Sequence, residues 1–504
     1  MEIEKMAYEK FRITHSELRI KKTGRENRMS IYLYPVIMTL ILAVPFFTGV
    51  YLKKSKRLDS SMICWLVLLT GLLVRIIYIS YTDINVRQHD VHNFFENNAG
   101  HAEYICYLFE NRALPDFDPR DIFQFYHPPL HHIICALWLT VVGKLGMSVE
   151  TTGVASLQFL TVMYSFLFTV FAYKTLKLLD IKPGTIELCT AAVTFHPTLI
   201  ILSGSLNNDI LSSLLSMSAI YFTAKWAKEQ KWLDIVMIAF SIGLGMFTKL
   251  SVGLLAPGVA AVFLYVFIKH IKEFKKLVPQ FLVFGIICVP IGLYWPVRNY
   301  VRFDVPLNYV PLISENSGQF IDRTPAERLL NWLPFQFASP FTQWEWNGAA
   351  YNEFNPIIAL WKNAMFDEGT FFSRSITLQS FCTALLFSGI FMSLFSVFAL
   401  FMMWFKNKDV KLENKILLTG VSLFIFGNYV LFCINYPHVC TENMRYCVPL
   451  IFVGAALLGM YIDKAAEFRH KYYGKSISVL KKGMAVFCGL SVFVYTAMMY
   501  YEAK

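Results

Sequence analysis

The chain has 504 residues, of which 56% are hydrophobic and only 16% are charged, and its mean hydropathy is +0.46. This composition excludes a water-soluble multidomain enzyme and places the chain in a lipid bilayer. The formal net charge of +11 does not by itself indicate nucleic acid, because Lys and Arg in a membrane protein first report which side of the bilayer a loop faces.

Apolar runs recur along the chain at the length of about 20 residues that a helix needs to cross the hydrocarbon core. They predict an all-α polytopic membrane protein. A membrane β-barrel would instead show alternating segments of about 10 residues. The predicted spans are 31–52, 61–81, 154–173, 184–204, 208–224, 233–250, 251–268, 277–297, 379–405, 416–435, 444–462 and 483–500. We therefore expect about 11 to 12 transmembrane helices.

A basic tail precedes the first predicted span. If that span crosses, the tail lies outside, against the positive-inside rule. Either the tail is translocated, or Pro35 and Pro45 mark a helix that does not cross completely. The apolar run begins only at residue 31 and is long, so no cleavable signal is evident.

Six Lys-rich connectors between predicted spans define the cytoplasmic face of the bundle. They lie at 53–57, 174–182, 225–231, 269–276, 406–415 and 464–482. All six share one side only if the apolar stretch 129–145, which is shorter than a span, lies along the interface. The positive charge therefore indicates topology, and no nucleic-acid partner is needed to explain it.

Two long outer segments, 82–152 and 298–378, interrupt the hydrophobic pattern. Connections of that length are usually functional, and these two gather acidic, basic, histidine and tryptophan residues at one membrane face. We divide the chain accordingly into a tail with an extra hydrophobic helix, a core that includes the first outer loop, a second outer loop and a set of C-terminal transmembrane helices. These parts are 1–60, 61–300, 301–378 and 379–504.

The first outer loop places Asp90 shortly beyond the membrane exit, between His89 and His92. A carboxylate there can act as a general base for a hydroxyl or amine acceptor. The alternative is that Asp90 only caps a helix. Residues 99–111 carry apolar side chains at helical spacing and predict an amphipathic surface helix.

The segment YHPPLHH at 126–132 predicts the start of another helix, because proline is tolerated in a first turn. Its histidines, which include His127, suit either a wet interface or a metal site. We assign no metal ligand and no cofactor and leave a divalent metal open.

The strings HDVH, GHAEY and QFYHPPLHH together resemble the first outer loop of GT-C-class glycosyltransferases that use polyprenyl-phosphate sugars. That class includes the protein O-mannosyltransferases and the lipid A aminoarabinose transferases, and the resemblance extends over residues 61–460. It implies a GT-C-type helical bundle with juxtamembrane helices in the first outer loop, Asp90 as the catalytic base and His127 in the donor site. The mannosyltransferases have a second acid where this chain has Val91, which argues against mannose and protein acceptors.

Further residues fit the same resemblance. Asp209 in LSGSLNNDIL stands at the outer mouth of a helix pair, either in the site or as the N-cap of the next helix. Lys249 resembles the lysine that faces the lipid phosphate in these families, and snorkelling to the interface is its alternative. Arg298, Arg302 and Arg445 lie at the outer interface, where arginine suits bidentate phosphate contacts or anchors to headgroups.

The second outer loop is aromatic. Its tryptophans predict an interfacial belt, or alternatively platforms for a sugar ring. They are Trp332, Trp344, Trp346 and Trp361. Asp367 and Glu368 follow in MFDEGTFF, and because this stretch resembles one in bacterial GT-C relatives, we include Glu368 among the substrate-binding residues.

The predicted function is an inverting glycosyltransferase that moves a sugar from a polyprenyl-phosphate carrier to a lipid, glycan or protein acceptor on the outer face. A phosphate leaves without protonation, so one base and a cationic clamp suffice. Asp90 takes the acceptor proton, while Lys249, Arg298 and Arg445 stabilise the phosphate.

A secondary transporter and a lipid-binding membrane protein are the alternatives. A transporter predicts inverted repeats and charged helices near the midplane, whereas charge here gathers at one face. A lipid-binding protein needs the clamp without the base. The scarcity of N-x-S/T sequons in the outer loops favours a bacterial cell membrane.

Overall fold

The computed structural model describes residues 26–86, 88–96, 99–332, 337, 339–342, 354–367, 376–467 and 471–502. Over these residues the protein is a bundle of helices, and an isolated bridge between Phe320 and His438 is the one β interaction recorded there. The all-helical architecture predicted from hydropathy is therefore confirmed. Arg87, Trp344, Trp346 and Glu368 lie outside the described residues.

The α-helices follow one another along the chain with short connections except in the two outer segments. They are α2 (Glu26–Lys54), α3 (Ser60–Tyr81), α4 (His101–Asn111), α5 (Leu130–Lys144), α6 (Val154–Leu178), α7 (Thr185–Thr194), α8 (Pro197–Ile201), α9 (Asp209–Glu229), α10 (Trp232–Met246), α11 (Ala256–Lys269), α12 (Phe274–Phe303), α13 (Pro325–Leu330), α14 (Pro356–Phe366), α15 (Ile376–Phe405), α16 (Leu412–Asn435), α17 (Pro449–Ala465) and α18 (Lys471–Glu502).

Eight helical segments of the described residues are long and apolar enough to cross a membrane. They are Tyr34–Lys54, Ser60–Tyr81, Val149–Leu178, Leu250–Lys269, Ile271–Phe303, Thr377–Phe405, Leu412–Asn435 and Gly474–Tyr500. The protein is a multi-pass integral membrane protein. The number of such helices is nevertheless lower than the 11 to 12 predicted from the sequence.

Four of the predicted spans account for this difference. The span 184–204 is divided into α7 and α8 because Pro197 cannot continue the preceding helix. The helices α10 and α17 have only 15 and 17 residues. The helix α9 has 21 residues, but it is rich in serines, three of which bond to backbone carbonyls of their own helix. Most of its side chains are buried against neighbouring helices, so α9 does not need an apolar surface.

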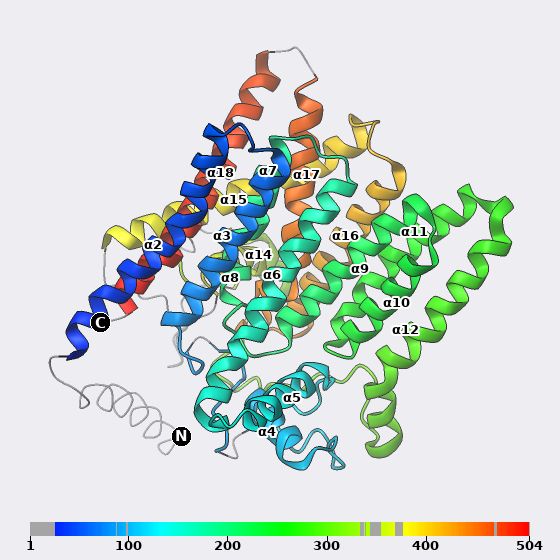
Figure 1. Cartoon of the computed structure of the whole chain (residues 1–504). Coiled ribbons are helices and arrows are strands. Elements are labelled where there is room, and N and C mark those ends of the chain that lie inside the picture. The colour runs from blue at the N-terminus through cyan, green and yellow to red at the C-terminus, as the bar shows by residue number, and fades with distance from the viewer. Residues whose placement is uncertain are drawn as a thin grey trace.

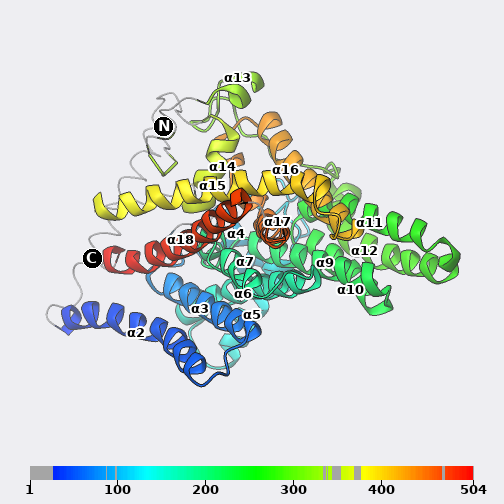
Figure 2. The same cartoon turned by 90° about the horizontal axis from the view of Figure 1, so that it is seen from above.

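The N-terminal helix α2 continues through Pro35 and Pro45. Its segment Tyr34–Lys54 is among the eight that can cross a membrane. The two prolines therefore do not interrupt the helix, in contrast to the alternative in which they prevent a complete crossing. Seen from above, α2 lies at one edge of the bundle and α12 at another, while α7, α9 and α17 lie in the middle (Figure 2).

The bundle has two distinct ends. The helices α4 and α5 lie across one end, below the long helices in Figure 1, as predicted for a juxtamembrane pair. At the other end ion pairs join the Lys-rich connectors to one another: Lys182 to Glu467, Lys228 to Asp180, Lys269 to Glu413 and Lys464 to Asp409. We call these the outer and the inner end, because the positive-inside rule places the Lys-rich end in the cytoplasm.

Candidate active site at the outer end

Segments that are far apart in the sequence bring two carboxylates and two cations together at the outer end. Asp90 comes from the first outer loop, Asp209 begins α9, Lys249 follows α10, and Arg445 lies in a single 3₁₀ turn before α17. Ion pairs connect all four side chains. We refer to Asp90, Asp209, Lys249 and Arg445 as the outer charge cluster.

Asp209 and Lys249 form the buried part of this cluster. The Lys249 ammonium donates a hydrogen bond to Asp209 Oδ1, and the two side chains are 14% and 2% exposed, in the order Lys249 and Asp209. The neighbouring backbone is held by Asn208, whose Nδ2 donates to Thr248 O at 3.0 Å. The ammonium also lies 4.7 Å from the centre of the Tyr446 ring, a cation–π contact. The N-cap of α9 is Asn208, so the alternative that Asp209 serves as this N-cap is wrong.

Arg445 lies between the two carboxylates. Its Nη1 is 3.8 Å from Asp90 Oδ2 and 3.9 Å from Asp209 Oδ2. Both distances exceed the roughly 2.7–2.9 Å of a charge-assisted hydrogen bond, so neither contact is a tight bridge. The guanidinium is therefore attracted to both acids without bidentate geometry to either. Its backbone N–H donates to Asn443 Oδ1 at 2.9 Å, which fixes the turn that carries it.

Asp90 is the accessible acid of the cluster, since its side chain is 41% exposed. Its backbone carbonyl accepts the N–H of His101 at 2.9 Å. Gly100, with φ +109°, is the N-cap of α4, and a Cβ there would lie 2.7 Å from Asp90 O. The loop is thus closed by a glycine, and the Asp90 carboxylate does not cap the helix, contrary to the alternative drawn from the sequence.

The Pro128–Pro129 pair precedes α5, as its sequence predicts, and Pro129 is the N-cap. Two contacts hold this segment beside the cluster: Leu130 N–H donates to Phe247 O at 3.1 Å, and Trp295 Nε1 donates to Tyr126 O at 3.0 Å. Phe247 directly follows α10, and Trp295 belongs to α12. The YHPPL segment is therefore fixed by tertiary contacts as well as by its prolines.

Three histidine rings stack behind the cluster. His127 lies 5.5 Å from His101, and His101 lies 5.1 Å from His132, where the Nδ1 and Nε2 atoms of the latter pair are 2.8 Å apart. Burial lowers the pKa of His127 well below its usual value, and the charges of Lys249, His132 and Arg445 lower it further. His127 is consequently neutral at pH 7, so it contributes a hydrogen-bonding group and not a third cation.

The structure does not join the other predicted arginines to this cluster. The guanidinium of Arg298 donates to Pro115 O and to Asn299 Oδ1, and lies 4.7 Å from the Trp295 ring. These contacts tie α12 to the first outer loop. Arg302 is exposed at the end of the same helix. Its positive charge lies near that of Arg298.

The aromatic loop is only partly described. Trp332 and Trp361 lie against each other with ring centres 5.8 Å apart. Trp344, Trp346 and Glu368 lie outside the described residues. Within the described part of the chain, no three His, Cys, Asp or Glu side chains are grouped so that they could hold a metal ion.

Three side chains beside the cluster had no role in the sequence analysis. Asp367 Oδ2 lies 2.7 Å from His89 Nε2, and Asp367 Oδ1 accepts a hydrogen bond from Asn443 Nδ2 at 2.8 Å. His89 is adjacent to Asp90 in the sequence, and this adjacency is the one signal that could have indicated its position. Nothing in the sequence pairs Asp367 with either partner.

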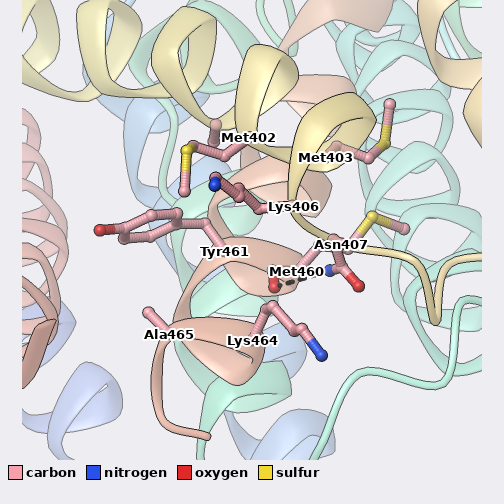
Figure 3. A pocket seen from close by; sticks show the side chains of 9 residues that line it. Met402, Met403, Lys406, Asn407, Met460, Tyr461, Lys464 and Ala465 are labelled. Carbon is pink, nitrogen blue, oxygen red and sulfur yellow. Dashed lines mark hydrogen bonds between the residues drawn. The ribbon is translucent and has the colours of Figure 1, made fainter. Parts of the chain in front are cut away.

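Two cavities lie at the inner end, remote from the outer charge cluster. One of about 10 Å³ is bordered by Met402, Tyr461 and Asn407, whose Nδ2 donates to Met460 O (Figure 3). The second, of about 150 Å³, is lined by the connectors that carry Lys182, Asp409 and Lys464. Neither cavity contains a member of the outer charge cluster.

Comparison with known proteins supports the resemblance seen in the sequence. Residues 126–295 match the family model of the dolichyl-phosphate-mannose-protein mannosyltransferases, and this segment holds His127, Asp209 and Lys249. No curated protein sequence matches the chain significantly. The motif resemblance to GT-C glycosyltransferases is thus confirmed for this segment.

Two solved structures are similar to this chain over 87% of its length. Both are crystal structures of ArnT from Cupriavidus metallidurans, one bound to undecaprenyl phosphate and one in the apo state. They share 11% and 12% sequence identity with this chain. Each match covers 87% of this chain and 77% of the ArnT chain, with a TM-score of 0.47.

Proposed function

We propose that this protein is an inverting glycosyltransferase that moves a sugar from a polyprenyl-phosphate carrier to an acceptor at the outer face of the membrane. The observation that carries the proposal is the contact between the exposed carboxylate of Asp90 and the buried guanidinium of Arg445. Asp209 pairs with this guanidinium through Oδ2 and with the Lys249 ammonium through Oδ1. The family match supports the donor class, since dolichyl phosphate is a polyprenyl phosphate.

The reaction needs one base and one anion clamp. Asp90 accepts the proton of an acceptor hydroxyl or amine, whose heteroatom attacks the anomeric carbon from the face opposite the phosphate. The bond between that carbon and the phosphate oxygen breaks, and the phosphate leaves with the electron pair. Lys249 and Arg445 stabilise its growing charge, so no acid is required for the leaving group.

The remaining residues have supporting roles in this proposal. Asp209 holds Lys249 and Arg445 in place and offsets part of their charge before the donor binds. Neutral His127 hydrogen-bonds the donor. Arg298 holds α12 against the first outer loop, Arg302 anchors to the lipid headgroups, and Glu368 belongs to the substrate-binding residues.

The Lys-rich connectors at the inner end support an external site, because the positive-inside rule places them in the cytoplasm. We infer a bacterial cytoplasmic membrane as the location. The sugar and the acceptor follow from neither the cluster nor the family match.

The test is transfer of a radiolabelled sugar from a polyprenyl-phosphate donor, compared with uptake of the same sugar into sealed vesicles. Asp90→Asn is expected to abolish transfer while the protein still folds and binds the lipid phosphate, since a general base contributes about 10²–10⁴-fold. Asp121→Asn, in the same loop, is the matched control. Retained turnover in Asp90→Asn removes this residue from the base role. Uptake without transfer identifies a transporter, and lipid-phosphate binding without either activity identifies a binding protein.

A further inference from the structure

Asp367 connects the two halves of the proposed reaction site. It follows α14, its side chain is 9% exposed, and its two carboxylate oxygens contact different segments of the chain. Oδ2 contacts His89, the residue before Asp90, at 2.7 Å. Oδ1 accepts from Asn443, two residues before Arg445, at 2.8 Å. One buried acid therefore contacts a neighbour of the proposed base and a neighbour of the proposed clamp.

Both carboxylate-bearing loops adopt a backbone conformation that is rare for side chains larger than hydrogen. Asp367 has φ +62° and Asp90 has φ +56°. Asp tolerates a positive φ better than most residues, but the ψ of −173° at Asp367 lies outside the left-handed helical region, and such a conformation persists only where surrounding contacts hold it. The hydrogen bonds of Asp367 are contacts of that kind, because they end at the loop of Asp90 and at the turn of Arg445.

Asp367 is itself well anchored to the Arg445 side of the site. Its backbone N–H donates to Asn363 O at 3.0 Å, and Thr342 Oγ1 donates to Asp367 O at 3.0 Å. Asn363 Nδ2 in turn donates to Glu442 O. The end of α14 and the turn that carries Arg445 thus form one connected unit.

A buried ion pair strengthens this unit. Arg328 Nη2 lies 2.7 Å from Glu442 Oε1, and both side chains are 1% exposed. The first outer loop is tied elsewhere through Gln88, which bonds to Gly204 O and to the N–H of Leu206 near Asp209. Among the contacts described, the bond between His89 and Asp367 is the hydrogen bond that links this loop to the unit around Arg445.

We infer that Asp367 is a positioning residue for sugar transfer: acting through His89 and Asn443, it holds Asp90 and Arg445 at the spacing that the reaction needs. The inference rests on the proposed function. Displacing a reacting group by about 1 Å can cost about 10²-fold in rate, so a link of this kind matters even though Asp367 touches neither donor nor acceptor. The competing role is a proton relay, in which the acid orients His89 as a base.

The experiment compares Asp367→Ala, Asp367→Asn and His89→Gln with Asp322→Ala, an exposed acid of the same outer segment. Asp367→Ala is expected to lower kcat about 10²-fold with KM for the donor little changed. His89→Gln keeps an N–H for Asp367 but cannot carry a proton, and is expected to retain most of the activity with an unchanged pH profile. Asp322→Ala is expected to behave like the parent protein.

Amide hydrogen exchange supplies a readout that does not depend on activity. Asp367→Ala is expected to speed exchange in 88–92 and 443–446, and Asp322→Ala is not. If Asp367→Ala fails to fold, Asp367→Asn replaces it, since its amide can still accept from Asn443 while the carboxylate contact with His89 is lost. Unchanged kcat and unchanged exchange overturn the inference, and so does a loss in His89→Gln equal to that in Asp367→Ala. Absence of transfer in the parent protein, with faster exchange in Asp367→Ala, overturns the proposed function and leaves the positioning contact standing.

Discussion

The ion pair between Lys182 and Glu467 at the inner end and the buried part of the outer charge cluster carry the same kinds of charged side chain in opposite environments. At the inner end Lys182 and Glu467 pair at 3.2 Å while 58% and 46% exposed. At the outer end Lys249, Asp209 and Arg445 are 14%, 2% and 8% exposed. Exposed pairs contribute little because water and salt screen them, whereas buried charges must recover their desolvation from their partners. The exposed inner pair therefore reports topology alone. The buried outer charges cost desolvation energy, and a reaction on an anionic donor gives a reason for keeping them there.

The largest expected effect concerns the buried pair. Asp209→Ala is expected to lower the free energy of unfolding by about 3–5 kcal/mol, because it leaves Lys249 buried beside Arg445 with its main counter-charge removed. Thermal unfolding in detergent measures this change, and Asp180→Ala at the exposed inner end is the matched control. A double variant, Asp209→Leu with Lys249→Met, is expected to regain stability but not transfer. If Asp209→Ala and Asp180→Ala had equal free energies of unfolding, the burial of Asp209 would make no difference to stability.

Next comes the cation nearest the proposed base. Arg445→Ala is expected to reduce turnover about 10²–10³-fold, the usual effect of removing one preorganised group that stabilises a transition state. Arg445→Lys retains the charge but not the planar guanidinium, so its turnover is expected to lie between that of Arg445→Ala and that of the parent protein. Donor titrations of the transfer rate measure both variants. Undiminished turnover in Arg445→Ala would separate this arginine from the reaction.

A smaller effect is expected from the histidine stack. Burial lowers the pKa of His101, His127 and His132 well below the usual value, and lowers that of His131 to about 4. As the pH falls below about 6.5, these histidines take up protons in the unfolded chain but not in the folded protein. The contribution of the neutral histidines to the free energy of unfolding is therefore complete above that pH and is lost as the pH falls below it. Melting temperatures between pH 7.5 and pH 4.5 are expected to fall. The slope is expected to be shallower in His132→Gln, and a flat profile in the parent protein would contradict the neutral stack.

The smallest effect belongs to the inner end. Lys464→Ala removes contacts with Asp409 and Glu467, which are 69% and 46% exposed. We expect no measurable change in melting temperature or in sugar transfer, and no added sensitivity to salt. A loss of transfer in this variant would show that the two ends are coupled, and the comparison would then need revision.

Sequence patterns identify every member of the outer charge cluster but not its organisation. Asp90, Asp209, Lys249 and Arg445 were all singled out, and the structure brings them together. Arg298 was singled out for the same reason, yet its described contacts are with the first outer loop and its own helix. Hydropathy reports how deep a residue lies along the membrane normal, and it contains no information on which helices are neighbours around the bundle axis.

The same distinction explains the spans. Eight helices were recognisable because lipid requires a long apolar surface. The helices α9 and α17 bury most of their side chains against neighbouring helices, and α10 has only 15 residues, so the apolar runs that predict spans there do not form helices of spanning length and composition. The contact of Asp367 with His89 joins residues 278 positions apart, and no local pattern could have indicated it.

By itself, the sequence determined that the chain is helical, spans a membrane and gathers its acids, histidines and arginines at one face. These properties follow from the free-energy cost of placing charges and unpaired backbone groups in hydrocarbon. Each segment must avoid that cost by its own composition, so the properties can be predicted segment by segment. Only the tertiary structure decided which cations share the acid of α9, which arginine stays outside the cluster, and which buried carboxylate ties the loops together. Those outcomes depend on packing between segments that are distant in the sequence, because the position of each helix determines which side chains its own side chains contact.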